Sequence, residues 1–91
     1  MKVNVKLFGH FRNIANSKEV DVDARGHTVN DVVSALVERF PELGPAVLEN
    51  DQVRPYVNLF LNGKNIKELN GLATGIKEGD GIVLFPPMAG G

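Results

Sequence analysis

The first quarter of the chain alternates between apolar and polar residues. Residues 2–7 and 18–23 each place an apolar side chain at every second position, the pattern of strands with one buried face. Gly9 interrupts the alternation, and residues 10–17 are expected to form a turn or a short helical piece. The two segments therefore predict a β-hairpin with a long connection. Its inward-facing positions are Val3, Val5, Leu7, Val20 and Val22.

The next segment, residues 29–40, changes to a helical period. Its apolar residues recur at steps of three and four, which places them on one stripe of a helix. Thr28 is expected to act as the N-cap, with Asp31 as an acidic residue in the first turn, and Pro41 ends the helix. We expect this helix to pack on the sheet. The stripe consists of Val29, Val32, Val33, Leu36, Val37 and Phe40.

The middle of the chain combines a connection with a hairpin. Residues 41–55 are interrupted by prolines and hold only a short apolar group, so they predict a compact connection with one irregular turn. Residues 56–61 then predict a strand that ends at Asn62–Gly63, a strong hairpin signal, followed by a short partner strand at residues 65–67.

The last part of the domain predicts a crossover and a central strand. Residues 70–80 are rich in glycine, and within them Leu72 and Ile76 are expected to fill the edge of the core. Residues 81–85 form an apolar run instead of alternating, which favours a strand in the middle of the sheet. The order of elements predicts an α+β domain with one helix laid across a mixed sheet.

The two faces of the last strands predict different roles. Side chains alternate along a strand, so one set faces the helix while the other points to the opposite face of the sheet. A helix covers only one face, and we therefore expect an exposed apolar patch that binds a partner. The alternative is that connecting loops cover it. The core set is Val57, Leu59, Leu61, Ile82 and Leu84. The partner-binding set is Phe60, Val83 and Phe85, with Phe8 as a neighbour.

Composition limits the classes of protein that fit. The chain has 91 residues, 43% hydrophobic and 23% charged, which suits one domain with a modest core. It has no cysteine and therefore no disulfide or thiolate site. No segment has the roughly 20 apolar residues of a membrane span or the pattern of a signal peptide, so we expect a soluble cytoplasmic protein. The net charge of −1 and the scattered basic residues argue against nucleic-acid binding.

The polar side chains predict no catalytic or metal centre in this chain. His10 and His27 lie in separate turns without a second ligand at metal spacing, and we expect them at the surface. Asp21 and Asp23 share a strand face, where we interpret them as charges that keep an edge strand soluble. The glycines of residues 70–80 form neither a dinucleotide fingerprint nor a P-loop. We therefore expect no bound cofactor.

The chain ends with the sequence FPPMAGG. We therefore divide the chain into a domain, residues 1–85, and a tail, residues 86–91, which we expect to be extended and flexible. Pro86 and Pro87 fix φ and favour an extended backbone, and the six tail residues can reach about 20 Å from the domain. The residues expected to position the end of the chain are Pro86, Pro87, Met88 and Ala89.

Gly90 and Gly91 carry the strongest functional signal in the sequence. Glycine offers neither packing nor conformational restraint, so it anchors a terminus poorly. It does allow the backbone to enter a narrow channel without a side-chain clash. We therefore predict that another protein acts on the terminal carboxylate. A frayed end without a role is the alternative.

Several of these features together resemble the MoaD and ThiS branch of the ubiquitin-like β-grasp proteins. They are the helix, the segment YVNLFLNGK, the turn KEGD and above all the ending VLFPPMAGG. The resemblance spans nearly the whole chain and is strongest for small archaeal modifier proteins. It implies a β-grasp fold, with a mixed sheet of four to five strands and one main helix packed on one face.

The resemblance also implies that the chemistry takes place at Gly91. An ATP-dependent activating enzyme of the ubiquitin-activating type, which uses ATP and Mg²⁺, converts the carboxylate to an acyl-adenylate. Sulfur transfer then yields a thiocarboxylate, whereas a lysine amine yields an isopeptide bond. The activating enzyme must close around the reacting end to exclude water from this hydrolysable intermediate. The chain itself is a substrate and not an enzyme.

Three functions follow as hypotheses. A MoaD-type sulfur carrier serves molybdopterin biosynthesis with a catalytic partner subunit of the MoaE type. A protein modifier is attached through Gly91 to lysines of target proteins, and a plain interaction module uses no terminal chemistry. Carrier and modifier need the same tail, so the sequence does not separate them. The lysines of this chain are most simply solvated charges, although they can also accept a second modifier: Lys2, Lys6, Lys18, Lys64, Lys67 and Lys77.

Overall fold

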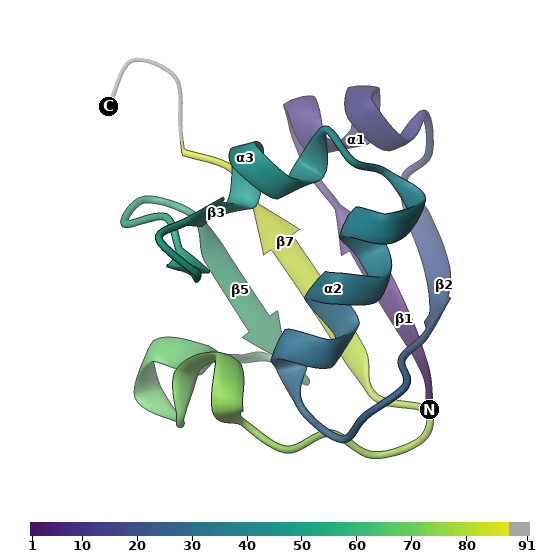
Figure 1. The fold of residues 1–91 in the computed structure, drawn as a ribbon, viewed down its shortest axis with the longest axis vertical. Coiled ribbons are helices and arrows are strands. Elements are labelled where there is room, and N and C mark those ends of the chain that lie inside the picture. Colours follow the sequence, from purple (N-terminus) through teal and green to yellow (C-terminus); the bar gives the residue numbers. More distant parts are fainter. Residues whose placement is uncertain (88–91) are drawn as a thin grey trace.

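The computed structural model, which describes residues 1–87, is built around a five-stranded mixed sheet (Figure 1). Its spatial order is β2-β1-β7-β5-β6, with β7 parallel to β1 and antiparallel to β5. The last strand therefore lies in the middle of the sheet, as its apolar run predicts. The strands are β1 (Lys2–Leu7), β2 (Glu19–Asp23), β5 (Asn58–Leu61), β6 (Lys64–Asn65) and β7 (Gly81–Phe85).

The predicted first hairpin is confirmed. Strands β1 and β2 pair in antiparallel fashion, with Val3 opposite Val22 and Val5 opposite Val20. Their connection contains a short helix, α1 (His10–Ala15), which buries Phe11 completely. Of the two forms expected for this connection, the structure therefore shows the helical piece.

Helix α2 (Val29–Arg39) crosses one face of the sheet, as the apolar stripe predicts (Figure 1). Thr28 and Asp31 form a reciprocal capping box: the backbone N–H of Asp31 donates to Thr28 Oγ1 at 3.3 Å, and that of Thr28 donates to Asp31 Oδ2 at 3.0 Å. The Thr28 hydroxyl also donates to Asp31 Oδ2, at 2.7 Å. These bonds, the hydroxyl bond first, lower the pKa of the Asp31 carboxyl group.

Residues 41–55 differ from the prediction. Instead of one irregular turn they form helix α3 (Leu43–Val47) and a small hairpin of β3 (Leu48–Glu49) and β4 (Gln52–Val53). The hairpin is tight because Asn50 and Asp51 both take positive φ, 53° and 62°, which Asn and Asp tolerate better than most residues. The prediction gave too much weight to the prolines.

The second predicted hairpin is confirmed at its turn, where Asn62 and Gly63 take φ of 49° and 86°. Its partner strand is shorter than predicted. Strand β6 ends at Asn65, and the next residues form the 3₁₀ turn η1 (Ile66–Glu68), because Asn65 Oδ1 accepts a bond from the Lys67 N–H at 2.9 Å and caps that turn.

The glycine-rich crossover contains a second 3₁₀ turn, η2 (Gly71–Ala73). Ile76 is buried and Leu72 packs against the core, as predicted. Two backbone bonds tie the crossover to the start of α2, from Val29 N to Thr74 O at 2.9 Å and from Ile76 N to His27 O at 2.8 Å.

The hydrophobic core lies between α2 and the sheet, and its buried residues run from Val3 to Leu84. All five residues predicted for the core side of the last strands are buried. The layering and strand order are those of the ubiquitin-like β-grasp fold that the resemblance implies. Within residues 1–87 no helix is both long and apolar enough to cross a membrane.

Candidate functional site

The face of the sheet opposite α2 carries the candidate site. Phe85 is 37% exposed, whereas Leu84, its neighbour in the chain, is 1% exposed. Phe60 and Val83 lie opposite each other in the pairing of β5 with β7, and both are half-buried. The predicted assignment of faces is therefore confirmed, while the predicted role in partner binding is not tested by it.

Three phenylalanines on this face form an aromatic cluster, consisting of Phe8, Phe60 and Phe85. Phe85 is its centre: the Phe8 ring stacks on it with centroids 4.5 Å apart, and the Phe60 ring meets it edge-on at 5.7 Å. Both arrangements are favourable for aromatic pairs. A backbone bond from Phe8 N to Leu84 O, at 3.2 Å, keeps the residue after β1 beside the end of β7.

Arg12 adds a cation to this cluster that the sequence analysis did not identify. Its guanidinium carbon lies 4.5 Å from the centre of the Phe8 ring, and its Nε donates to Leu7 O at 2.6 Å. The contact stabilises the ring by cation–π attraction and fixes α1 relative to β1. The spacing of four residues between Phe8 and Arg12 was the available signal, but it spans a strand end and a helix start.

The tail begins at the edge of the aromatic cluster. Pro86 directly follows Phe85 and is half-buried, while Pro87 is exposed. The other tail positions, Met88 to Gly91, lie outside the described residues, so the roles predicted for them and for the tail as a unit remain predictions. The structure does place the start of the tail next to the exposed aromatic rings.

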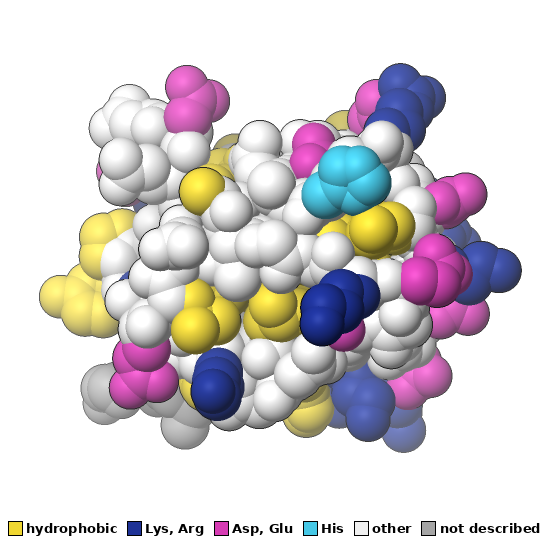
Figure 2. All heavy atoms as spheres, turned by 90° about the horizontal axis from the view of Figure 1, so that it is seen from below, with side chains coloured by type: hydrophobic (Ala, Val, Ile, Leu, Met, Phe, Trp, Pro, Cys, Tyr) yellow, Lys and Arg dark blue, Asp and Glu magenta, His cyan; other side chains and the backbone are white. Residues whose placement is uncertain are grey.

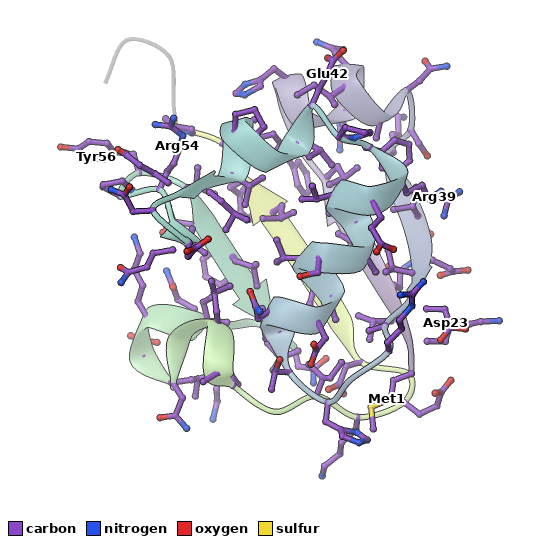
Figure 3. All side chains as sticks on the ribbon, viewed as in Figure 1. Met1, Asp23, Arg39, Glu42, Arg54 and Tyr56 are labelled. Atoms are coloured by element: carbon purple, nitrogen blue, oxygen red, sulfur yellow. The ribbon has the colours of Figure 1, made fainter. Side chains whose placement is uncertain are left out.

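The remaining polar candidates do not gather around a centre. His10 and His27 are both exposed, as expected. In the described part of the chain no group of three or more histidine, aspartate or glutamate side chains is arranged to hold a metal ion. Tyr56 is a further exposed aromatic residue, at 78%, and points away from the domain (Figure 3).

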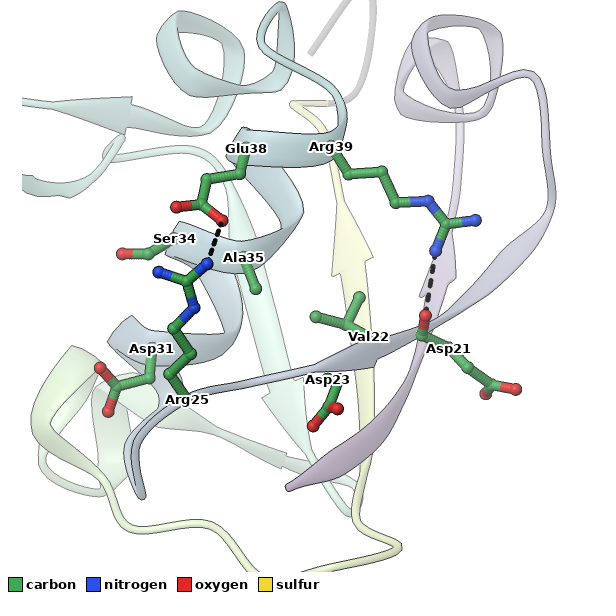
Figure 4. Close-up of a pocket in the computed structure, with 9 residues that line it drawn as sticks. All are labelled: Asp21, Val22, Asp23, Arg25, Asp31, Ser34, Ala35, Glu38 and Arg39. Carbon is green, nitrogen blue, oxygen red and sulfur yellow. Dashed lines mark hydrogen bonds and ion pairs between the residues drawn. The ribbon is translucent and has the colours of Figure 1, made fainter.

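A groove between β2 and α2 brings together charged side chains from both elements (Figure 4). Strand β2 is an edge strand, as the sequence predicts. Arg39 Nη1 donates to the backbone oxygen of Asp21 at 3.0 Å, and Asp23 accepts from the N-terminal amine at 3.2 Å. These contacts protect the strand edge and hold the chain start.

Acidic and basic side chains are interspersed on the face seen in Figure 2, with apolar side chains in small separate groups. In the groove, Arg25 Nη2 and Glu38 Oε2 form an ion pair at 3.9 Å, and both side chains are largely exposed. Such a pair contributes little to the stability of the fold. The aromatic cluster, on the sheet face opposite α2, is our candidate surface for a protein partner.

Comparisons with known proteins support the family resemblance and the fold. A model of the ThiS family matches residues 5–91. The sequence is 36% identical to small archaeal modifier protein 3 of Haloferax volcanii, covering 100% of both chains. It is 29% identical to the sulfur carrier protein CysO of Mycobacterium tuberculosis, over 77% of this chain and 78% of the relative. The structure matches the crystal structure of small archaeal modifier protein 1 of H. volcanii with a TM-score of 0.87, 33% identity and full coverage of both chains.

Proposed function

The chain belongs to the ThiS family, and we propose that it is a sulfur carrier whose Gly91 carboxylate is activated and converted to a thiocarboxylate. The observation that carries this proposal is the position of the tail start. Pro86 leaves the domain beside the aromatic cluster, which offers a partner an apolar docking surface at the point where the tail begins. The likeness to a sulfur carrier protein supports the chemistry.

The proposed reaction has two steps. A carboxylate oxygen of Gly91 attacks the α-phosphorus of ATP, which forms the acyl-adenylate and releases pyrophosphate. Hydrosulfide, or a donor equivalent to it, then attacks the carbonyl carbon, and AMP leaves with the electrons of the broken C–O bond. A carboxylate is a poor electrophile until its oxygen becomes a good leaving group, which is why ATP is needed.

The chain's own part in this reaction is binding and presentation. Phe60, Val83, Phe85 and Phe8 are proposed to dock the activating enzyme, because aromatic side chains often dominate the energy of an interface. The two prolines stiffen the start of the tail, and the two glycines pass through a narrow channel. ATP and Mg²⁺ belong to the activating enzyme, and we propose that this chain binds no cofactor and works in the cytoplasm.

A second function, that of a protein modifier, is favoured by the 36% sequence identity to small archaeal modifier protein 3 over the full length of both chains. In this role the ε-amine of a lysine on a target protein attacks the carbonyl carbon of the same adenylate, the C–O bond to AMP breaks, and AMP and a proton leave as the isopeptide bond to Gly91 forms. The first role instead passes the sulfur to an acceptor, and we propose that this occurs in molybdopterin formation, with a catalytic partner subunit of the MoaE type. One chain can perform both roles, because both begin with the same adenylate.

Mass spectrometry on protein recovered from its native cells tests these proposals. The carrier role predicts an intact mass raised by exchange of one oxygen for sulfur at Gly91. The modifier role predicts Gly-Gly remnants on lysines of other proteins after digestion. Neither species is expected in a strain that lacks the activating enzyme. If wild-type cells contain neither, the proposal is wrong.

A further inference from the structure

We propose that Gly9 is a positioning residue: it seats Pro86 and so sets the direction in which the tail leaves the domain and the rate at which Gly91 is activated. The inference deepens the proposed function and rests on it. It concerns a residue in the turn between β1 and α1, far from the tail in sequence.

Gly9 and Pro86 are in direct contact. A Cβ atom added to Gly9 would lie 2.6 Å from Cγ of the proline ring and 3.4 Å from its Cδ. The first distance is well inside van der Waals contact, so the ring occupies the space that a side chain would need. Gly9 also has φ of 57° and ψ of −139°, a conformation that favours glycine.

Contacts on both sides of Gly9 hold its backbone in place beside Pro86. On one side, the backbone N–H of Phe8 donates a hydrogen bond to Leu84 O, and the Phe8 ring is stacked on Phe85. On the other, Gly9 O accepts the bond from Arg12 N, at 3.1 Å, that closes the first turn of α1. Movement of Gly9 away from the tail would break these contacts. A side chain at Gly9 is therefore expected to displace Pro86 instead.

Displacement of Pro86 changes the point and direction in which the chain leaves β7, because the proline ring is part of the backbone and its φ is fixed. Pro86 is the first residue after β7, so a change in its position alters the path toward Gly91. Misplacement of a reacting group by about 1 Å can lower a rate by about a hundredfold. The conformation of the turn at Gly9 is thus expected to influence how Gly91 is positioned for adenylation.

The other positive-φ glycines provide a contrast. Gly63, Gly71 and Gly79 need glycine for their backbone conformation, yet within the described residues an added Cβ would meet no atom within 4 Å. Gly71 has φ of 58°, almost the value at Gly9. Substitution of Gly71 therefore also places a side chain at positive φ, but without contact with the tail, which makes it the control.

The test compares Gly9→Ala and Gly9→Leu with Gly71→Ala and Gly71→Leu in adenylation by the activating enzyme, measured as pyrophosphate exchange. We expect Gly9→Leu to lower kcat about tenfold or more, with a smaller effect of Gly9→Ala, and KM to change much less, because the docking surface is retained. The Gly71 variants should keep the wild-type kcat at temperatures where they are folded, whatever thermal stability they lose.

A rescue variant separates positioning from a purely structural role. Pro86→Ala removes Cγ and Cδ, so the closest remaining contact of the added Cβ is Pro86 Cβ at 3.8 Å. Gly9→Ala should therefore lower kcat less in the Pro86→Ala background, measured against Pro86→Ala alone, than it does in the wild-type background. A wild-type kcat for Gly9→Leu, an equal loss in Gly71→Leu, or an equal effect of Gly9→Ala in the two backgrounds would overturn the inference.

A second readout needs no enzyme. The backbone amide resonances of the tail should shift in Gly9→Leu but not in Gly71→Leu, since only the first substitution reaches Pro86. Unchanged tail resonances would overturn the seating of Pro86. If wild-type protein is never adenylated while the tail resonances still shift, the proposed function fails and the seating of Pro86 by Gly9 stands.

Discussion

The two faces of β5 and β7 differ sharply although their residues are neighbours in the chain. Leu59 and Leu84 are buried under α2, each only 1% exposed, while Phe60 and Phe85 meet on the uncovered face. The strand geometry alone produces this division, because successive side chains point to opposite faces. The same two strands thus contribute to stability with one set of residues and offer an apolar surface with the other.

The largest expected effect concerns neither face but the tail that follows them. Deletion of Gly90 and Gly91, or replacement of Gly91 by Phe, should abolish adenylation, because the reacting group is lost or no longer fits a narrow channel. Within residues 1–87 the last core residue is Leu84, and chain termini usually make few native contacts, so the melting temperature should stay close to that of the wild type. Adenylate formed on the truncated chain would refute the role of the tail.

Substitutions on the buried face should destabilise the fold. Leu59→Ala or Leu84→Ala leaves a cavity among fully buried neighbours and is expected to lower the free energy of unfolding by about 2 to 5 kcal/mol. Urea denaturation measures this loss. At temperatures where these variants remain folded, their affinity for the activating enzyme should match that of the wild type.

Substitutions on the exposed face should have the opposite profile. Phe60→Ala or Phe85→Ala is expected to weaken binding to the activating enzyme by about 1 to 3 kcal/mol, because aromatic anchors dominate interfaces. Stability should fall less than in the leucine variants. Calorimetric titration measures the affinity for the activating enzyme, and thermal melting measures the stability of each variant. If the phenylalanine variants melt as low as Leu84→Ala and bind normally, the docking role belongs elsewhere.

The smallest expected effect lies at the start of α2, where pH sets the strength of the capping box. Hydrogen bonds from Thr28 lower the pKa of Asp31 in the folded state below its ordinary 3.8. The folded state therefore binds fewer protons, and the stabilisation is present above the ordinary pKa and lost as pH falls through the lowered one. Asp31→Asn should be less stable than the wild type near neutral pH.

Denaturation at several pH values checks this prediction. The difference in the free energy of unfolding between the wild type and Asp31→Asn should shrink as the carboxyl group becomes protonated in acid. Thr28→Ala, which removes the hydroxyl partner, should cost about 1 kcal/mol near neutral pH. A difference that grows on acidification would contradict the assigned hydrogen bonds.

Local sequence rules predicted the elements that have strong periodicity. Strand alternation located Val3 and Val22, and the helical stripe with Thr28 and Asp31 located α2. The apolar run of residues 81–85 placed β7 in the middle of the sheet. In each case the local pattern and the burial that tertiary packing requires point to the same answer.

The sequence was less informative where elements are short or where contacts join distant segments. Helix α3 has only five residues, little more than one helical turn, and contains Pro45, so its apolar pattern gave too short a signal. The turn at Asn50 and Asp51 could have been recognised, since both residue types tolerate positive φ. The contact of Gly9 with Pro86 had no local signal, because it depends on the parallel pairing of β1 with β7.

The most direct measurement of the central claim is tandem mass spectrometry after incubation with the activating enzyme, ATP and hydrosulfide. The account predicts that one oxygen is replaced by sulfur on Gly91, that the exchange requires ATP, and that Phe85→Ala slows it while Leu84→Ala, where folded, does not. Absence of sulfur from Gly91 in the wild-type protein, or equal rates for the two variants, would contradict the account.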